Sequence, residues 1–295
     1  MMANYVNDFF TKNNDTYYRL PFKKIGQRVL TVKLNKKSNK IRFDIKTDVV
    51  NNRGYCNFRF SNCDLIESVA LEIGNISLVQ VHNSDGKILH KLRDILGIVD
   101  NTVLPFLPKD APIPFLDLYE CCIHIELNNK TKNVDLLSLT YDEIEFDSDL
   151  YILAQYNDVS KIKHLPLNKY SAKLVPILEF YMLSIFFTGA ESTMNKNIVY
   201  NICDPNIVNT ILVYTPNNNI ESYNVRLDGK EILTSITTQG EFSIIKINKF
   251  LNPSKHSIVL RFDLKVQNDK QKFYVYTIGR SLNRIISGRF YTLEM

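Results

Sequence analysis

The chain has 295 residues, 45% hydrophobic and 23% charged, so it is long enough to form two domains that each bury a core. Its net charge of +5 is mild and its basic residues are scattered, which argues against a nucleic-acid-binding domain and against sequence-specific nucleic acid as a partner. Five cysteines without short repeated spacing argue against a disulfide framework and favour free thiols in a reducing compartment.

Segments in which apolar and polar residues alternate, separated by turn residues, predict short strands along the whole chain. In the first half these segments are Arg28–Leu34, Lys40–Lys46, Tyr55–Phe60, Leu65–Ile73, Glu120–Leu127 and Asp135–Phe146. In the second half they are Leu178–Phe187, Ile198–Ile202, Ile207–Thr215, Tyr223–Leu227, Phe242–Ile247, His256–Val266, Phe273–Thr277 and Arg284–Leu293. Helical periodicity is confined to Gly86–Ile98 and Asp149–Ile162.

The segments between these strands also carry information. The basic cluster Lys33–Lys40 predicts a solvated hairpin loop, and the proline-rich segment Val103–Phe115 predicts an extended, packed loop, with a ligand for a partner domain as the alternative. The apolar segment Leu174–Ala190 predicts a buried strand pair, because a membrane span needs about 20 apolar residues. The N-terminus lacks a basic region and an apolar core, so we expect no secretory signal.

Two stretches of the chain share one pattern. Each opens Ile-Glu-Ser, alternates apolar and polar residues, and turns at a glycine, over Ile66–Gly74 and Ile220–Gly229. The two glycines lie 155 residues apart (229 − 74), about half the chain length. The repeat predicts one all-β unit present twice, with domains at 1–170 and 171–295 and a linker near Pro166–Lys173.

The search for reactive groups is mostly negative. His124 and Glu126 share one face of a predicted strand, but the Pro-Cys-x-x-Cys pair of zinc deaminases is missing, which favours a structural or surface role. The other histidines, at 82, 90, 164 and 256, have no neighbours at metal-binding spacing. The acidic residues at 142, 143, 145, 147 and 149 predict a solvated strand edge or lattice contact rather than a calcium loop. We therefore expect no catalytic, cofactor-binding or metal-ligating residues.

Several short motifs, in one order along the chain, carry a family resemblance. They are Leu65–Gly74, Leu104–Phe106, Pro112–Glu120, Asn201–Val213, Leu227–Gly229, Pro253-Ser254 and Leu282–Gly288. In this order the chain resembles the double-jelly-roll capsid proteins of nucleocytoplasmic large DNA viruses, such as iridoviruses, phycodnaviruses and mimiviruses. The chain departs from that family in its short length, its lack of Trp, and Asn75 where the family has a second glycine.

The resemblance implies an all-β fold of two tandem eight-stranded antiparallel jelly rolls. It further implies a non-enzymatic virion protein whose homotrimers form pseudo-hexagonal capsomers and tile an icosahedral shell, assembled in the host cytoplasm. The implied partners are neighbouring capsomers, minor capsid proteins and an internal viral membrane. Candidate contact surfaces are the arm containing Asn4–Val6 and Phe9-Phe10, the segment Pro105–Pro114, and Phe290–Met295.

Three alternatives remain open at this point. A scaffold protein of the poxvirus type would form a honeycomb lattice on immature virion membranes and then be discarded. A carbohydrate-binding jelly-roll module would need aromatic residues converging on a groove, and no such cluster can be recognised in the sequence. A cupin-type enzyme is the weakest alternative, because its metal-binding histidines are absent.

Overall fold

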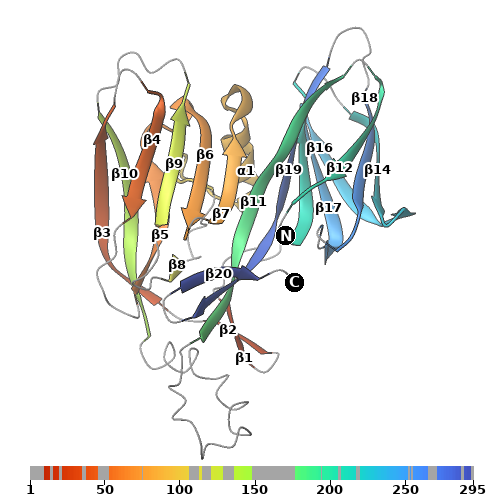
Figure 1. The fold of residues 1–295 in the computed structure, drawn as a ribbon. Coiled ribbons are helices and arrows are strands. Elements are labelled where there is room, and N and C mark those ends of the chain that lie inside the picture. Colours follow the sequence, from red (N-terminus) through yellow and green to blue (C-terminus); the bar gives the residue numbers. More distant parts are fainter. Residues whose placement is uncertain are drawn as a thin grey trace, which may run out of the picture. The chain divides into compact units, whose positions relative to one another are not determined.

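The fold was obtained as a computed structural model, shown in Figure 1. The structure describes residues 10–13, 16–19, 22–34, 38–45, 53–74, 76–105, 113–114, 121–128, 136–147, 177–193, 195–204, 207–216, 220–251, 253, 255–264, 271–286 and 289–293. These residues belong to two compact units, and the main division between the units falls between Met182 and Leu183. Two short segments group with the unit on the other side of this division: Leu78–Val81 with the second unit and Leu282–Leu293 with the first.

The first unit is built almost entirely of strands. They are β1 (Phe10–Asn13), β2 (Thr16–Arg19), β3 (Phe22–Lys33), β4 (Lys40–Ile45), β5 (Arg53–Phe60), β6 (Ile66–Ile73), β7 (Ile76–His82), β8 (Ile113–Pro114), β9 (Cys121–Leu127), β10 (Leu136–Phe146) and β20 (Arg289–Leu293). Two 3₁₀ turns, Cys63–Leu65 and Ser84–Gly86, and the helix α1 (Ile88–Leu96) complete it. The helix confirms the predicted helical segment Gly86–Ile98, and it ends where Gly97 takes the left-handed conformation.

The second unit also consists of strands. They are β11 (Ile177–Thr193), β12 (Asn197–Ile202), β13 (Ile207–Tyr214), β14 (Ile220–Leu227), β15 (Lys230–Glu231), β16 (Thr234–Gln239), β17 (Phe242–Leu251), β18 (Ile258–Leu264) and β19 (Gln271–Ile286). The first residues of β11 and the last residues of β19 are counted with the first unit.

Both units arrange their strands in the same order. In the first unit, one sheet runs β3-β10-β5-β8 and the other β4-β9-β6-β7 (Figure 1). If β3 to β10 are numbered 1 to 8, the two sheets read 1-8-3-6 and 2-7-4-5. In the second unit the orders are β11-β19-β13-β17, extended at its edge by β16, and β12-β18-β14-β15. With β17 as the sixth strand, the second unit gives the same two orders, so one eight-stranded topology occurs twice.

The sequence repeat coincides with this structural repeat. Ile66–Ile73 and Ile220–Leu227 are β6 and β14, the fourth strand of each unit, and each turn leads into the fifth strand. Gly74 and Gly229 both have positive φ, at 57° and 80°, which a tight turn requires and which glycine adopts at little cost. The prediction of one all-β unit present twice is therefore confirmed.

Equivalent strands also share their burial. The second strands, β4 and β12, alternate strictly between exposed and buried residues, as expected of a strand with one face on the core. The third strands, β5 and β13, are buried along almost their whole length. In the first unit Phe43 of β4 packs edge-to-face on Phe60 of β5, with ring centroids 6.2 Å apart, so aromatic side chains join the two sheets.

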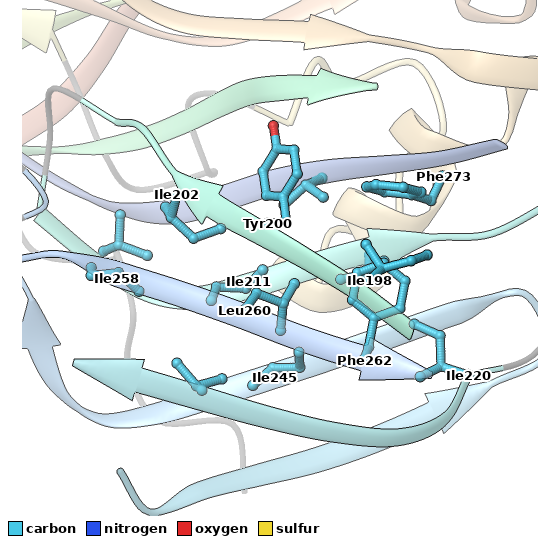
Figure 2. Packing of buried hydrophobic residues seen from close by; sticks show 14 of the residues in the cluster. Ile198, Tyr200, Ile202, Ile211, Ile220, Ile245, Ile258, Leu260, Phe262 and Phe273 are labelled. Atoms are coloured by element: carbon cyan, nitrogen blue, oxygen red, sulfur yellow. The ribbon is translucent and has the colours of Figure 1, made fainter. Parts of the chain in front are cut away.

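The core of the second unit is a single cluster of apolar side chains between its two sheets (Figure 2). Phe273 of β19 packs edge-to-face on Phe262 of β18 and on Tyr200 of β12, with centroid distances of 5.2 and 5.8 Å. β12 and β18 belong to one sheet and β19 to the other, so these rings connect the two layers. At about 25 cal/mol per Å² of buried apolar surface, such rings contribute a large share of each unit's stability.

Three sequence predictions were wrong in detail, and several strands were not predicted. Leu174–Ala190 is not a strand pair, since one long strand, β11, occupies the described part. The segment 284–293 is divided between the end of β19 and β20, which pair with each other in antiparallel fashion. Lys33–Lys40 is not a hairpin loop, because β3 and β4 lie in different sheets. Six strands, β1, β2, β7, β8, β15 and β16, were not predicted. The sequence of β16, Thr-Ser-Ile-Thr-Thr-Gln, has a single apolar residue and so shows no alternation. The linker 166–173 and the second helix, 149–162, lie outside the described residues.

Candidate functional site

Polar side chains gather on the outward face of the sheet formed by β4, β9 and β6. In β9 the side chains of Ile123 and Ile125 are buried in the core, whereas His124 and Glu126 are half-buried on the opposite face. The predicted placement of these two residues on one face is confirmed. Cys122 belongs to the same outward face, yet its side chain is buried.

Strand register brings a third residue to this face. Glu72 of β6 pairs directly with Cys122, and Ala70 pairs with His124. The Nε2 atom of His124 lies 3.3 Å from Oε2 of Glu72 and 3.2 Å from Sγ of Cys122. A sulfur, a nitrogen and a carboxylate oxygen thus lie within 4.8 Å of one another, the only such group among the described residues. We name Glu72, Cys122 and His124 the β6–β9 cluster.

The other neighbours of the cluster also come from the flanking strands. Across β9, Asp44 and Arg42 of β4 pair with Cys122 and His124 respectively, and the Arg42 guanidinium contacts the Asp44 carboxylate at 2.6 Å. Further along β9, Glu126 accepts a hydrogen bond from the Ser68 hydroxyl at 3.3 Å. Glu126 thus shares a face with His124, as predicted, but the carboxylate in contact with the His124 imidazole is that of Glu72.

The five cysteines all have free thiols, as expected from their number and spacing. Cys121 and Cys122 point to opposite faces of β9, so only Cys122 belongs to the cluster. Burial raises the pKa of the Cys121 thiol, which keeps that group neutral in the core. Burial likewise raises the pKa of Cys63 to about 11.

The acidic run at the end of β10 forms ion pairs with β3 and β5. Asp142 is 3% exposed, and its carboxylate accepts hydrogen bonds from Lys24 at 2.7 Å, Asn57 at 2.8 Å and Arg59 at 3.1 Å. Two further pairs, Glu143–Arg28 at 2.5 Å and Glu145–Lys23 at 2.9 Å, join β10 to β3. The prediction of a solvated edge is wrong for Asp142, because Lys24 of β3 and Arg59 of β5, which pair with its neighbours Ile144 and Thr140, reach its carboxylate with their charged groups. Residue 149 lies outside the described residues.

The electrostatics of Asp142 follow from these contacts. Burial alone would raise its pKa, but hydrogen bonds from Arg59, Lys24 and Asn57 outweigh that effect, so the pKa lies below its ordinary value. The carboxylate is therefore charged at neutral pH and holds β3, β5 and β10 together. Its partners satisfy it fully, which leaves no reason to assign it a chemical role.

The remaining candidate residues are dispersed. His256 contacts Asp228 at the β14–β15 turn, with Nδ1 2.8 Å from Oδ2, and His90 contacts Asp94 within α1. His82 is in β7, and residue 164 lies outside the described residues. Of the candidate contact surfaces, residues 1–9, 106–112, 294 and 295 lie outside them too. No helix in the described part of the chain is long and apolar enough to span a membrane.

Comparison with known proteins was informative at the level of structure alone. No protein-family model and no curated protein matches the sequence significantly. Among solved structures, VP54 of PBCV-1, fitted into a reconstruction of the virophage Sputnik, aligns with a TM-score of 0.55 at 11% identity, over 95% of this chain and 98% of that one. The quasi-atomic model of the PBCV-1 virus capsid aligns with a TM-score of 0.51 at 11% identity, over 95% and 98%.

The chain is a double jelly roll. The alignment covers both units and nearly the full length of the compared protein, and the strand orders 1-8-3-6 and 2-7-4-5 occur in each unit. The predicted fold class, two tandem eight-stranded antiparallel jelly rolls, is thus confirmed. At 11% identity, the likeness of this double jelly roll to the compared protein is one of fold.

Proposed function

We propose that this double jelly roll is a viral structural protein, a capsid subunit whose homotrimers form pseudo-hexagonal capsomers and tile an icosahedral shell. The observation that carries the proposal is the duplicated eight-stranded topology, which aligns with VP54 and with the PBCV-1 capsid model over 95% of this chain. Each chain contributes two similar jelly rolls, so three chains around a three-fold axis would place six jelly rolls around that axis. Six jelly rolls make a pseudo-hexagonal outline, and hexagons tile a surface.

The further parts of the proposal concern partners and location. We propose that neighbouring capsomers and minor capsid proteins contact the trimer, that one surface faces an internal viral membrane, and that assembly takes place in the host cytoplasm. The protein would act without catalysis, through its interfaces. The domain limits 1–170 and 171–295 remain part of this proposal, since the boundary lies outside the described residues.

The physical properties of the two units suit such a role. Apolar cores between paired sheets make each unit rigid, and the ion pairs of Asp142 fix the packing of three strands in the first unit. We expect the contact within a trimer to bury roughly 2,000 Å² or more, as obligate oligomers do. Contacts between trimers should be smaller and more polar, so that misplaced capsomers can dissociate and the lattice can close.

The test is the mass of the purified full-length chain, measured by light scattering behind a sizing column, with negative-stain imaging of the peak. We expect a species near three times 34.2 kDa with hexagonal outlines, and lattices as the concentration rises. A stable monomer at all concentrations would refute the proposal. Presence on immature virions and absence from mature particles would refute the shell role and identify a scaffold.

A further inference from the structure

We propose that the β6–β9 cluster is a Zn²⁺-binding site in which Cys122, His124 and Glu72 are the protein ligands and the fourth position is open to solvent. The inference is independent of the proposed capsid function, because it rests on the chemistry of three side chains within the first unit. These residues supply the thiolate sulfur, imidazole nitrogen and carboxylate oxygen that zinc binds in proteins.

The distances between the three ligand atoms match a tetrahedral site. Zinc lies about 2.3 Å from sulfur and about 2.0–2.2 Å from nitrogen and oxygen, so adjacent ligand atoms in a tetrahedron are roughly 3.4–3.6 Å apart. The observed separations are 3.2 Å between Sγ of Cys122 and Nε2 of His124, and 3.3 Å between Nε2 and Oε2 of Glu72. The third separation, between Sγ of Cys122 and a carboxylate oxygen of Glu72, is within 4.8 Å. Small side-chain rotations are therefore enough to admit the ion.

The Nε2 atom of His124 cannot be a hydrogen-bond donor to one neighbour in the cluster and an acceptor from the other at the same time. Both contacts converge on one atom, Nε2 of His124, and that nitrogen carries at most one proton. If Nε2–H donates to Glu72, it is not an acceptor for the Cys122 thiol. If Nε2 is instead unprotonated and accepts a hydrogen bond from the thiol, it has no proton to donate to the Glu72 carboxylate, and the two electron-rich atoms repel each other. A divalent cation between the three atoms would interact favourably with all of them at once.

The backbone holds the three ligands in place. Cys122 and His124 are two residues apart on β9 and therefore share a face, and Glu72 is paired directly with Cys122 on the hydrogen-bonded neighbour β6. Sites built on strands are more rigid than sites on loops, so little order has to be gained when the metal binds. The ion would link β6 to β9 across the sheet.

Charge and exposure determine the kind of metal and its access. Arg42 of β4 lies opposite His124, and its guanidinium contacts the Asp44 carboxylate at 2.6 Å. The side chains of His124 and Glu72 are 40% and 31% exposed, which gives the ion a route from solvent. A thiolate and an imidazole favour zinc over magnesium or calcium, which prefer oxygen ligands.

The experiment is zinc titration of the metal-free full-length protein in competition with a chromophoric chelator, together with the visible spectrum of the Co²⁺ form. We expect one Zn²⁺ per chain and the thiolate-to-cobalt charge-transfer band of a tetrahedral site. Glu72→Gln and His124→Gln should each weaken binding at least about tenfold. Both residues are half-exposed, so these variants should remain folded, and unfolding curves of the metal-free proteins will verify that.

Matched controls use residues of the same type that lie outside the cluster. Glu126→Gln changes a carboxylate on the same face of β9, His90→Gln an exposed histidine, and Cys203→Ser an exposed thiol. All three should bind zinc as the unmodified chain does. Failure to bind one zinc per chain would overturn the proposal. So would unchanged affinity in Glu72→Gln, or a loss in Cys203→Ser as large as in His124→Gln.

Discussion

Gly279 of β19 is the position where one added methyl group should damage the fold most. It pairs with Val208 of β13, next to an irregularity in the β13–β19 register. A Cβ atom at Gly279 would overlap the carbonyl oxygen of Ile207 and lie 2.7 Å from the carbonyl carbon of Ile207 and 2.9 Å from Cα of Val208. All three atoms are backbone, so no side-chain rotation can relieve the contact, and the strands must separate.

The cost of Gly279→Ala follows from that geometry. Overpacking a well-packed site costs about 1–3 kcal/mol, and each hydrogen bond lost as the strands separate costs about 1 kcal/mol. We therefore expect about 3 kcal/mol of destabilisation, measured by denaturant unfolding. Hydrogen exchange should locate the loss of protection in residues 207–214 and 271–280. Gly240→Ala is the control, because its Cβ would meet nothing within 4 Å and only its positive φ of 59° costs energy, about 1 kcal/mol.

Two results would refute this reasoning. One is a Gly279→Ala variant whose free energy of unfolding lies within about 0.5 kcal/mol of that of the unmodified protein, which is the usual effect of a surface substitution that disturbs nothing. The other is equal destabilisation by Gly279→Ala and Gly240→Ala, since that would assign the effect to backbone flexibility and not to the close approach of β13 and β19.

Three further substitutions test other parts of the structure. Phe262→Ala should destabilise the second unit by about 3–5 kcal/mol in denaturant unfolding, because it leaves a cavity beside Phe273, whereas a cost under about 1 kcal/mol would mean that the two sheets do not pack as described. Tyr223→Phe removes the hydroxyl that lies 2.6 Å from the Ser243 hydroxyl, and should cost about 1 kcal/mol; no change would show that water replaces the bond equally well. Asp142→Asn should cost about 2 kcal/mol at pH 7, because it removes the buried charged acceptor that Lys24 and Arg59 share. The folded-state pKa of Asp142 is depressed, so its stabilisation is complete above pH 3.8 and is lost as the pH falls through the lower folded-state pKa. Unfolding curves at a series of pH values should show the difference from the unmodified chain shrinking in that acidic range, and a constant difference would contradict the assignment.

Much of the fold could be read from local patterns in the sequence. Alternation in Lys40–Lys46 and Ile198–Ile202 predicted half-buried strands, and each of these segments forms the second strand of its unit. The Ile-Glu-Ser repeat identified the fourth strand of each unit and the turn that follows. Such features depend on residues close together in the chain, so periodicity and turn chemistry are enough to reveal them.

The composition of the β6–β9 cluster could be predicted only in part from the sequence. His124 and Cys122 are two residues apart, and their shared face follows from the period of a strand. Glu72 lies 50 residues before Cys122 (122 − 72), and only the register of β6 against β9 places it beside the histidine. The sequence placed Glu126 on the face of His124 and favoured a structural or surface role for both residues; in the structure Glu126 accepts a hydrogen bond from Ser68, and Glu72 is the carboxylate beside His124.

By itself, the sequence determined that the chain is all-β, that one unit occurs twice, and which strands present one apolar face, because these properties follow from residues at neighbouring positions. Tertiary structure decided which strands pair. It placed β3 and β4 in different sheets, joined 177–193 into one long strand, and turned an acidic run into ion pairs with Lys24 and Arg59. The reason is that pairing between distant strands is set by the packing of the complete core, and a local pattern of alternation is compatible with many partners.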